Sequence, residues 1–384
     1  ICHSNFLVKL RLRPDSLSNF HMNLLLGYFT AFLLLIISIF VGILQTTELE
    51  PSSFIATVVT RILFRDVFPH NDDESVVRMR KLTFSTAPRI TPPGNIRIQK
   101  VHKKLDDSQF SLRIYDNRTE NDISNIKKMI PVLIWYHGGG FVLGSAEQDD
   151  DICFQLSIYT GFLIVSVDYR LAPEHEYPAA HLDSMAAFHW ITHNIIDYGG
   201  DNSSIFLAGE SAGGNLAAGV TAKNIENLFY NQSYAYSEST SDKISLPDTK
   251  RNPVKGLLLI YPCLIHGVYS NSHFEYRNVN PLLTSTQMQW FYNLYFSNQY
   301  LDPLHYTASP LRTSPQLLTY FPPTTFITAK YDVLLDESVE FHNKLRDHGV
   351  KSNIRCYNNT IHGFFGRFGP YKTAMSYASE SLIS

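Results

Sequence analysis

Cysteine is scarce in this chain, which argues against two classes of protein. The 384 residues include four cysteines, at positions 2, 153, 263 and 356, too few for the disulfide framework of a small secreted scaffold. They form no C-x-x-C pair and no cluster with histidine, so no zinc site is expected. The sequence permits a disulfide but does not assign one.

Excess charge and internal repetition are also lacking. The formal net charge of -3 gives no electrostatic reason to expect binding to nucleic acid. No internal repeat is visible, so a repeat architecture is not expected. What remains is an ordinary globular composition, 44% hydrophobic, in a chain long enough for one large α/β domain or two smaller ones.

The first fifty residues have a different composition. The run Leu24–Leu44 carries no charge, and its 21 residues (44 minus 24, plus one) match the ~20 that a helix needs to cross a bilayer. Basic residues precede this run and acidic residues follow it: Lys9, Arg11 and Arg13, then Glu48 and Glu50. The positive-inside rule therefore predicts a cytosolic segment over 1–23 and a single-pass type II anchor over 24–44.

A cleaved signal peptide is the alternative for this run. Its apolar core is usually about 7–15 residues long and ends in a small-residue cleavage site, whereas this run is longer and ends in Ile43-Leu44-Gln45. A retained anchor is therefore favoured. The chain begins with Ile1, and a true start at Met22 would remove the basic flank on which the orientation depends.

Four N-x-[S/T] sequons lie beyond the apolar run, at Asn117, Asn202, Asn231 and Asn358. Together with the anchor, they agree with a lumenal or extracellular domain that carries N-linked glycans. The expected location is the membrane of the endoplasmic reticulum, with the domain after the anchor in the lumen.

After the anchor, apolar β-rich runs alternate with helical stretches. Strands are predicted at 132–136, 162–168, 205–208, 256–261, 324–329 and 352–357, with helices at 148–160, 179–198, 212–228 and 336–348. This alternation predicts a mostly parallel sheet covered on both faces. We expect a linker and cap segment over 45–130, a catalytic domain over 131–384 with a cap insertion at about 263–320, and a surface loop over Asn231–Pro253.

The pentapeptide Gly209-Glu210-Ser211-Ala212-Gly213 follows one of these strands and opens a helix. A serine between glycines at such a turn fits a nucleophile elbow, because the tight turn lifts the hydroxyl above the sheet edge. The pattern alone is weak. Here it comes 74 residues (211 minus 137) after His137-Gly138-Gly139-Gly140-Phe141, which also ends an apolar run. The two motifs in this order indicate a serine esterase.

Serine needs a base, and the base needs an acid to orient it. In an α/β-hydrolase these follow in the order Ser, Asp or Glu, His. Asp332 follows the strand at 324–329 and is the predicted acid, while Asp336 is expected to cap the next helix. His362 heads a late loop and is the predicted base. The other histidines near or within helices are read as structural or surface residues: His181, His189, His193, His342 and His348.

Backbone amides are expected to bind the oxyanion. The glycines leave the Gly138 and Gly139 amides bare, and Ala212 supplies the third N–H donor. His137 precedes the serine, so we expect it to hold the glycine loop rather than act as the base. A charge cluster is read as scaffold: Asp168, Arg170, Glu174 and Asp183.

These motifs resemble the hormone-sensitive-lipase branch of the α/β-hydrolases. The resemblance rests on His137-Gly138-Gly139-Gly140, Asp168-Tyr169-Arg170-Leu171-Ala172-Pro173-Glu174 and Gly209-Glu210-Ser211-Ala212-Gly213-Gly214. With the anchor, the chain looks similar to arylacetamide deacetylase-like and neutral cholesterol ester hydrolase-like membrane esterases. Glu210 is a departure, because this branch more often has Asp there, and it puts contacts behind the elbow in doubt.

The sequence therefore predicts an α/β-hydrolase fold with a helical cap and one transmembrane helix, acting on a small-molecule ester or amide without metal or organic cofactor. Phe141, Trp290 and Phe291 are the candidate pocket residues. A catalytically silent receptor on this fold is the first alternative. The gibberellin receptors are of this kind and lack the catalytic histidine, so His362 argues against it. A cholinesterase-like adhesion ectodomain is the second alternative. Such ectodomains lose the nucleophilic serine, so Ser211 argues against it. Substrate and oligomeric state are left open.

Overall fold

The computed structural model describes residues 73–86, 96–105, 107–119, 129–236, 252–277, 279, 282–297, 301–366 and 371–383. The expected anchor at 24–44 lies outside them, as does the cytosolic segment at 1–23. Within the described part, no helix is both long enough and apolar enough to span a membrane. Asn231 lies on a helix, and the structure does not describe its side chain.

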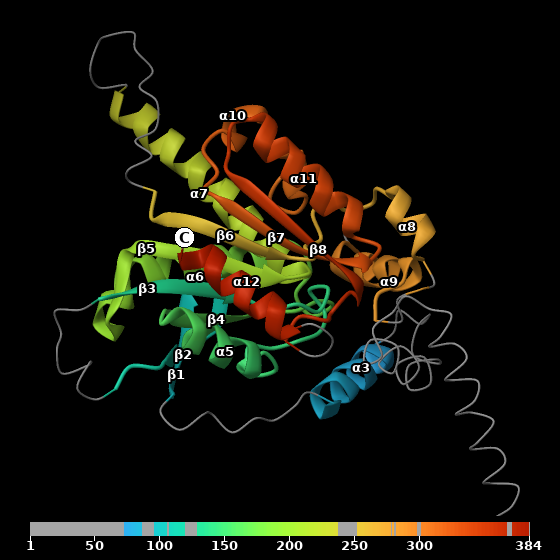
Figure 1. Ribbon diagram of the computed structural model, residues 1–384, viewed down its shortest axis with the longest axis horizontal. Helices are drawn as coiled ribbons and strands as arrows, with labels where there is room; N and C mark the ends of the chain where they lie inside the picture. Colours follow the sequence, from blue (N-terminus) through green and yellow to red (C-terminus); the bar gives the residue numbers. More distant parts are fainter. Residues whose placement is uncertain are drawn as a thin grey trace, which may run out of the picture. The chain divides into compact units, whose positions relative to one another are not determined.

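One eight-stranded sheet forms the centre of the catalytic part (Figure 1). Its spatial order is β1-β2-β4-β3-β5-β6-β7-β8. The strands are β1 (Arg97–Leu105), β2 (Ser108–Asp116), β3 (Ile130–Tyr136), β4 (Leu163–Tyr169), β5 (Gly200–Glu210), β6 (Val254–Ile260), β7 (Thr324–Tyr331) and β8 (Ser352–Ile361). Strands β3 to β8 pair in parallel, and β2 joins β1 and β4 antiparallel. The predicted α/β class is confirmed.

Helices cover both faces of the sheet. The helices are α3 (Asp73–Thr86), α5 (Asp150–Thr160), α6 (Ala179–Asn194), α7 (Ala212–Tyr236), α8 (Asn271–Glu275), α9 (Ser285–Tyr295), α10 (Pro315–Leu318), α11 (Leu335–Asp347) and α12 (Tyr371–Ile383), with 3-10 turns η1 (Ile195–Tyr198) and η3 (Pro310–Arg312). One apolar core joins α6, α7 and α11 to the sheet. A second joins α5 and α12 to the opposite face. The central strands are therefore apolar on both sides, as buried parallel strands require.

Three sequence-based boundaries differ from the structure. The segment 45–130 is not only linker and cap, because β1 and β2 lie within it and belong to the catalytic sheet. Strand β1 escapes notice because it is an edge strand that carries several basic residues rather than an apolar run. Helix α7 runs to Tyr236, into the segment expected to be a loop. Asp336 does not cap α11: its N-cap is Leu334, which makes no side-chain cap bond.

The insertion between β6 and β7 contains α8, α9, η3 and α10. Helix α9 begins with a capping box, in which the Thr284 hydroxyl accepts the Gln287 N–H and the Gln287 side chain accepts the Thr284 N–H. This reciprocal pairing satisfies two amides at the start of the helix. It fixes the start of α9 and thereby the direction in which its aromatic residues point.

Candidate active site

The nucleophile elbow lies at the junction of β5 and α7. Ser211 has a positive φ of 55°, and its N–H donates to the Ile260 carbonyl at 2.9 Å. Neither flanking glycine tolerates a side chain: a Cβ on Gly209 would lie 2.7 Å from the Tyr136 carbonyl oxygen, and one on Gly213 would overlap that same carbonyl. The strained turn therefore depends on small residues on both sides of the serine.

The structure brings Ser211, His362 and Asp332 together. His362 Nε2 lies 3.0 Å from Ser211 Oγ, and His362 Nδ1 lies 2.7 Å from Asp332 Oδ2. Since an ionised carboxylate only accepts, Nδ1 carries the proton and Nε2 is left to accept the serine hydroxyl. These are the contacts of a nucleophile, a base and an orienting acid.

The acid is itself held by backbone groups. Asp332 is 1% exposed, and its Oδ1 accepts the Leu334 N–H at 2.9 Å. Its carbonyl oxygen accepts the Leu335 N–H at 3.2 Å. Oδ2 is then directed toward the imidazole. Asp336 instead accepts the Ser272 N–H at 2.8 Å and does not contact His362.

Tyr261 and Glu210 support the base and the elbow from behind. The Tyr261 ring lies 4.5 Å from the His362 ring, centroid to centroid. Its hydroxyl donates to Glu210 Oε2 at 2.5 Å. Glu210 also packs against the glycine loop, because a Cβ on Gly138 would lie 3.0 Å from its Oε1. The Glu that departs from the family pattern therefore connects the elbow to the glycine loop. Tyr261 belongs to no motif, so sequence reasoning missed it.

The glycine loop is shaped by His137 and Gly139. His137 Nδ1 lies 2.7 Å from the Gly138 carbonyl oxygen, and its ring stacks on Tyr169 at 4.2 Å. Gly139 has a φ of 113° and its carbonyl accepts the Leu143 N–H at 2.8 Å. His137 lies away from the contacts of the triad and acts on the loop.

An arginine of α3 also holds this loop. Arg80 Nε donates to the Val142 carbonyl at 2.9 Å and Nη2 to the Ala172 carbonyl at 2.8 Å. Its guanidinium also pairs with both oxygens of Glu174, and this hydrogen bonding is the main reason why the pKa of Glu174 is lowered. Val142 in turn donates to the Gly139 carbonyl at 3.1 Å. The segment before the sheet, which has no recognisable motif, therefore supports the glycine loop.

The remaining charge cluster and His181 are structural. Arg170 pairs with the fully buried Asp183, which also accepts backbone N–H groups. The Asn215 side-chain nitrogen donates to two backbone carbonyls, so its side-chain oxygen faces His181. His181 Nε2 therefore donates to that oxygen at 3.0 Å, and His181 Nδ1 accepts the Tyr295 hydroxyl. Burial lowers the pKa of His181 to about 4, which keeps this imidazole neutral.

Helix α9 presents two different faces. Phe291 lies over the glycine loop, because a Cβ on Gly140 would meet its ring. Met288 and Tyr292, three residues before and one after, line a small cavity that is partly open to solvent. Its walls are Ile265, His266, Gly267, Val268, Tyr269, His273, Met288, Gln289 and Tyr292. Trp290 is 3% exposed and packs into the core, so it does not line this cavity.

Phe141 is also a packing residue. It is 3% exposed and stacks on Tyr295 of α9 with the ring centroids 4.1 Å apart. Of the three candidate pocket residues, only Phe291 therefore lies beside both the glycine loop and the cavity-lining face of α9. Met288 and Tyr292 line the cavity from the same helix.

The fold and the site together define a serine hydrolase of the α/β type. The chain matches the family model described as alpha/beta hydrolase fold over residues 133–366 and the model described as steryl acetyl hydrolase over residues 26–224. The chain belongs to the α/β-hydrolase fold family.

Named relatives narrow the chemistry. The chain is 30% identical over 304 residues to carboxylesterase NlhH of Mycobacterium tuberculosis, covering 78% of this chain and 85% of that protein. It is 29% identical over 291 residues to an arylesterase of Saccharolobus solfataricus, covering 75% and 83%. The solved Pyrobaculum calidifontis esterase has 31% identity and a TM-score of 0.67, covering 87% and 98%. These similarities support the hormone-sensitive-lipase and carboxylesterase branch, and the protein is a serine carboxylic-ester hydrolase.

The glycine loop gives a direct prediction. Gly139→Ala combines a φ of 113° with a Cβ that would overlap the Leu143 carbonyl, so the loop must shift. Loss of one oxyanion donor lowers kcat on the order of 10²–10³-fold, and we expect a loss of this size in steady-state ester hydrolysis. Gly161→Ala is the matched control, because its φ is 69° and its Cβ would meet no atom within 4 Å. Equal losses in the two variants would refute a special role for the loop.

Proposed function

We propose that this esterase acts through an acyl-enzyme formed on Ser211. His362 takes the serine proton as Oγ attacks the acyl carbonyl, and Asp332 stabilises the imidazolium that results. The N–H groups of Gly138, Gly139 and Ala212 bind the oxyanion. The alcohol leaves with the proton from His362, and a water activated by His362 then releases the acid. The observation that carries this proposal is the continuous contact from Ser211 Oγ through His362 to Asp332.

We further infer that the substrates are esters of a short acyl group with a bulky apolar alcohol, such as steryl acetates. The family model described as steryl acetyl hydrolase supports this class, as does the small, mostly apolar cavity beside α9. An amide of an aromatic amine, the arylacetamide class, is the second candidate from the sequence resemblance. Rates on a steryl acetate and on an arylacetamide, measured with one preparation, distinguish these classes.

The face of α9 predicts the dependence on acyl-chain length. Tyr292→Ala removes a wall of the cavity, so kcat/KM should fall roughly fourfold for each added methylene that loses its burial, with p-nitrophenyl acetate least affected. Asn293→Ala, at an exposed position of the same helix, should leave the profile unchanged. Trp290→Ala should lower the rate equally for all chain lengths and cost about 3–5 kcal/mol of stability, because its side chain is in the core.

The outcome that would remove this cavity from the substrate site is a Tyr292→Ala profile parallel to that of the wild type. Phe291→Ala adds a second comparison, because this ring contacts the glycine loop. We expect it to reduce the rate even on acetate, where the cavity contributes little.

We also propose that residues 24–44 anchor the protein in the endoplasmic reticulum as a type II membrane protein with a lumenal catalytic domain. The charge-free run, its basic flank and the four sequons support this topology. Of the sequons, Asn358 is exposed on β8, whereas the Asn202 amide donates to the Thr192 carbonyl. Loss of a glycosidase-sensitive mass shift in Asn358→Gln would support the lumenal domain; digestion of the catalytic domain by protease outside intact microsomes would contradict it.

A further inference from the structure

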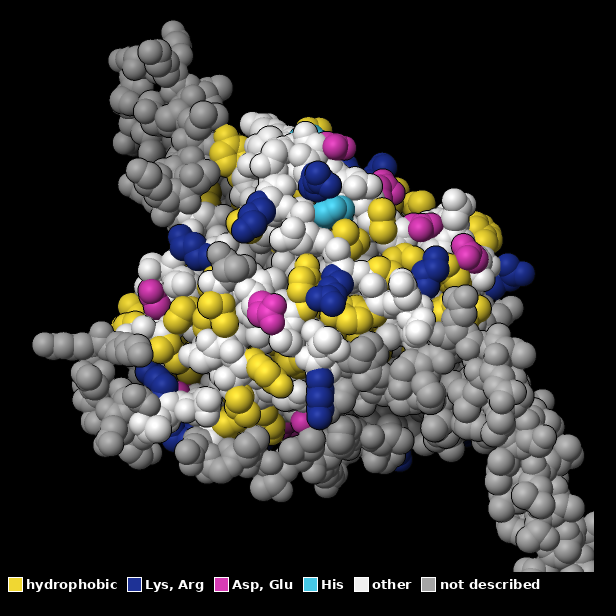
Figure 2. All heavy atoms as spheres, in the orientation of Figure 1, with side chains coloured by type: hydrophobic (Ala, Val, Ile, Leu, Met, Phe, Trp, Pro, Cys, Tyr) yellow, Lys and Arg dark blue, Asp and Glu magenta, His cyan; other side chains and the backbone are white. Residues whose placement is uncertain are grey.

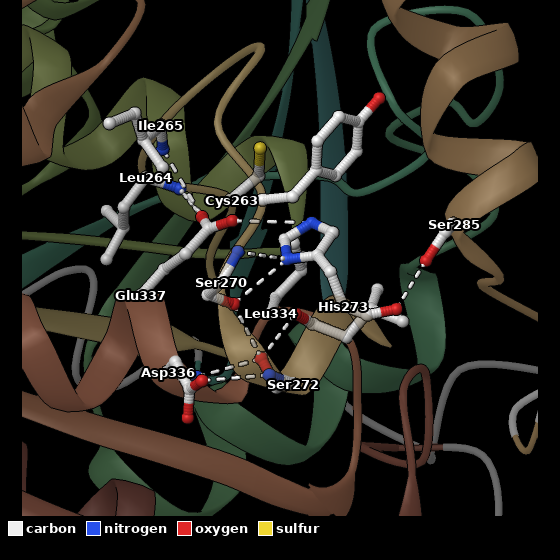
Figure 3. A network of polar contacts seen from close by, with 12 residues as sticks. Cys263, Leu264, Ile265, Ser270, Ser272, His273, Ser285, Leu334, Asp336 and Glu337 are labelled. Carbon is white, nitrogen blue, oxygen red and sulfur yellow. Dashed lines mark hydrogen bonds and ion pairs between the residues drawn. The ribbon is translucent and has the colours of Figure 1, made fainter. Parts of the chain in front are cut away.

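A buried carboxylate connects the catalytic acid loop to the segment that follows β6 (Figure 3). Glu337, in the first turn of α11, is 2% exposed. Its Oε2 accepts the N–H groups of Leu264 at 2.7 Å and Ile265 at 3.2 Å. The preceding residue, Cys263, donates its N–H to the Ser211 carbonyl at 3.2 Å. One oxygen of Glu337 therefore braces the segment that contacts the nucleophile elbow.

Helix α8 of the cap holds the acid loop from the other side. Ser272 Oγ donates to the carbonyl of Val333, the residue after the catalytic acid, at 2.7 Å. The Ser272 N–H donates to Asp336 Oδ2 at 2.8 Å, and the Asp336 N–H donates to Ser272 Oγ at 3.3 Å. Three hydrogen bonds thus connect one cap residue to the loop that positions Asp332.

His273 completes the network. It is 3% exposed, its Nδ1 lies 3.0 Å from Ser270 Oγ and accepts the Ser270 N–H, and its Nε2 lies 3.8 Å from Glu337 Oε1. Oε1 has no hydrogen-bond partner among the described residues. The imidazole is therefore the polar group that faces Oε1 of Glu337, at a distance longer than a hydrogen bond.

The surroundings of Glu337 disfavour its charge at neutral pH. Burial raises the pKa of Glu337 to about 8, and nearby Asp332 and Glu340 act in the same direction. Burial lowers the pKa of His273, against the effect of Asp332 and Asp336. The titratable groups around Glu337 are His273, Asp332, Asp336, Glu340 and the buried Cys263. The carboxyl is therefore neutral below about pH 8 and gains a negative charge above it.

We propose that Glu337, together with His273, is a positioning pair for ester hydrolysis, holding the cap helix α8, the acid loop and the segment after β6 in the arrangement in which Asp332 supports His362. The proposal rests on the esterase activity and adds residues that do not touch the reacting atoms. A carboxyl that served only as a loop brace would need its two backbone hydrogen bonds and no particular charge state. The two roles therefore separate in the dependence of kcat on pH.

Glu337→Gln is the variant that separates them. Its amide keeps an oxygen for Leu264 and Ile265 but stays neutral at every pH. From pH 6 to 7, where the wild-type carboxyl is also neutral, the kcat values should agree closely. Above pH 8 the wild type gains a negative charge near Asp332, which favours the imidazolium on His362, so the ratio of wild-type to variant kcat should rise about fivefold by pH 9.

Glu380→Gln is the matched control, because it makes the same change at an exposed position of α12, and Glu380 is not among the groups that shift the pKa of Glu337. Its kcat ratio to the wild type should stay flat from pH 6 to 9. A flat ratio for Glu337→Gln over the same range, measured on p-nitrophenyl acetate, would overturn the role of the Glu337 charge and leave only a structural brace.

Two further variants test the geometry. Glu337→Leu leaves the Leu264 and Ile265 amides unpaired and should lower kcat on the order of 10²-fold with little change in KM, because small displacements of catalytic groups have effects of this size. Ser272→Ala should lower kcat about tenfold, because it removes the hydroxyl that contacts Val333 and Asp336 and leaves the Glu337 side chain in place. The Gln variant and Ser272→Ala keep the test decisive if the Leu variant does not fold.

The possible failures are distinguishable. A wild-type protein that turns over no ester would overturn the esterase assignment itself. An active wild type whose kcat is unchanged in Glu337→Gln at pH 9 and in Ser272→Ala would overturn only the positioning pair.

Discussion

Ser211→Ala is expected to abolish ester turnover, with a loss in kcat on the order of 10⁶-fold. The hydroxyl is the only group of this residue that reaches His362 Nε2, at 3.0 Å, and without it no acyl-enzyme can form. The fold should be retained, because the methyl group of alanine fits wherever the serine Cβ fits in the elbow. Steady-state hydrolysis of p-nitrophenyl acetate measures the effect, and the thermal unfolding midpoint checks the fold.

Labelling by a fluorophosphonate provides the control for this variant. The wild type should be labelled stoichiometrically and Ser211→Ala should remain unlabelled. Labelling that survives the substitution would mean that another serine is the nucleophile. Ser203, exposed on β5, is a matched serine whose replacement by alanine should affect neither labelling nor turnover.

Asp332→Asn is expected to have the second largest effect, about 10⁴-fold in kcat. An amide nitrogen in place of Oδ2 would face His362 Nδ1 as a donor, and turning the amide to present its oxygen would put that nitrogen against the Leu334 N–H. Either arrangement disfavours the tautomer in which Nε2 can accept the serine proton.

Asp336→Asn is the matched comparison for this prediction. Its side chain accepts the Ser272 N–H, which an amide oxygen can also accept, so we expect a loss of less than about tenfold. Both variants should be assayed on one ester at saturating concentration. If Asp336→Asn proved the more damaging change, the assignment of the catalytic acid would be wrong.

The sequence allowed the three residues of the triad to be named together because chain order and strand ends constrain where they lie. In a parallel sheet the carboxyl ends of strands share one edge, so motifs that follow β3, β5 and β7 are brought together whatever lies between them. Ser211, Asp332 and His362 follow from that rule combined with the Ser-Asp-His order. The glycine loop follows in the same way, since it directly follows β3.

The support around the site could not be predicted, because it depends on contacts between segments without motifs. Arg80 reaches Val142 across 62 positions of sequence, and Ser272 reaches Val333 across 61. The sequence around Arg80 and around Ser272 contains no motif that would indicate these contacts. Edge strand β1 was missed because both of its faces carry polar residues. Trp290 was assigned to the pocket because its place in the cap insertion does not say which way its side chain points.

The burial of Glu337 could not be predicted from the sequence either. Its position in the first turn of a helix is typical of an exposed acid that favours the helix dipole, and the sequence offers no sign that it is buried. Only the fold places the Leu264 and Ile265 amides against it. The consequence, a carboxyl that stays neutral to about pH 8, is a property of tertiary structure alone.

The central claim is that ester hydrolysis proceeds through an acyl group on Ser211. The most direct measurement mixes the enzyme with p-nitrophenyl acetate, quenches it in acid within the first turnover, and maps the modified peptide by mass spectrometry. The account predicts a burst of nitrophenol and one acetyl group on the peptide that contains Ser211. Rapid turnover of the ester with no acetylated peptide at any quench time, or acetylation confined to a different serine, would contradict it.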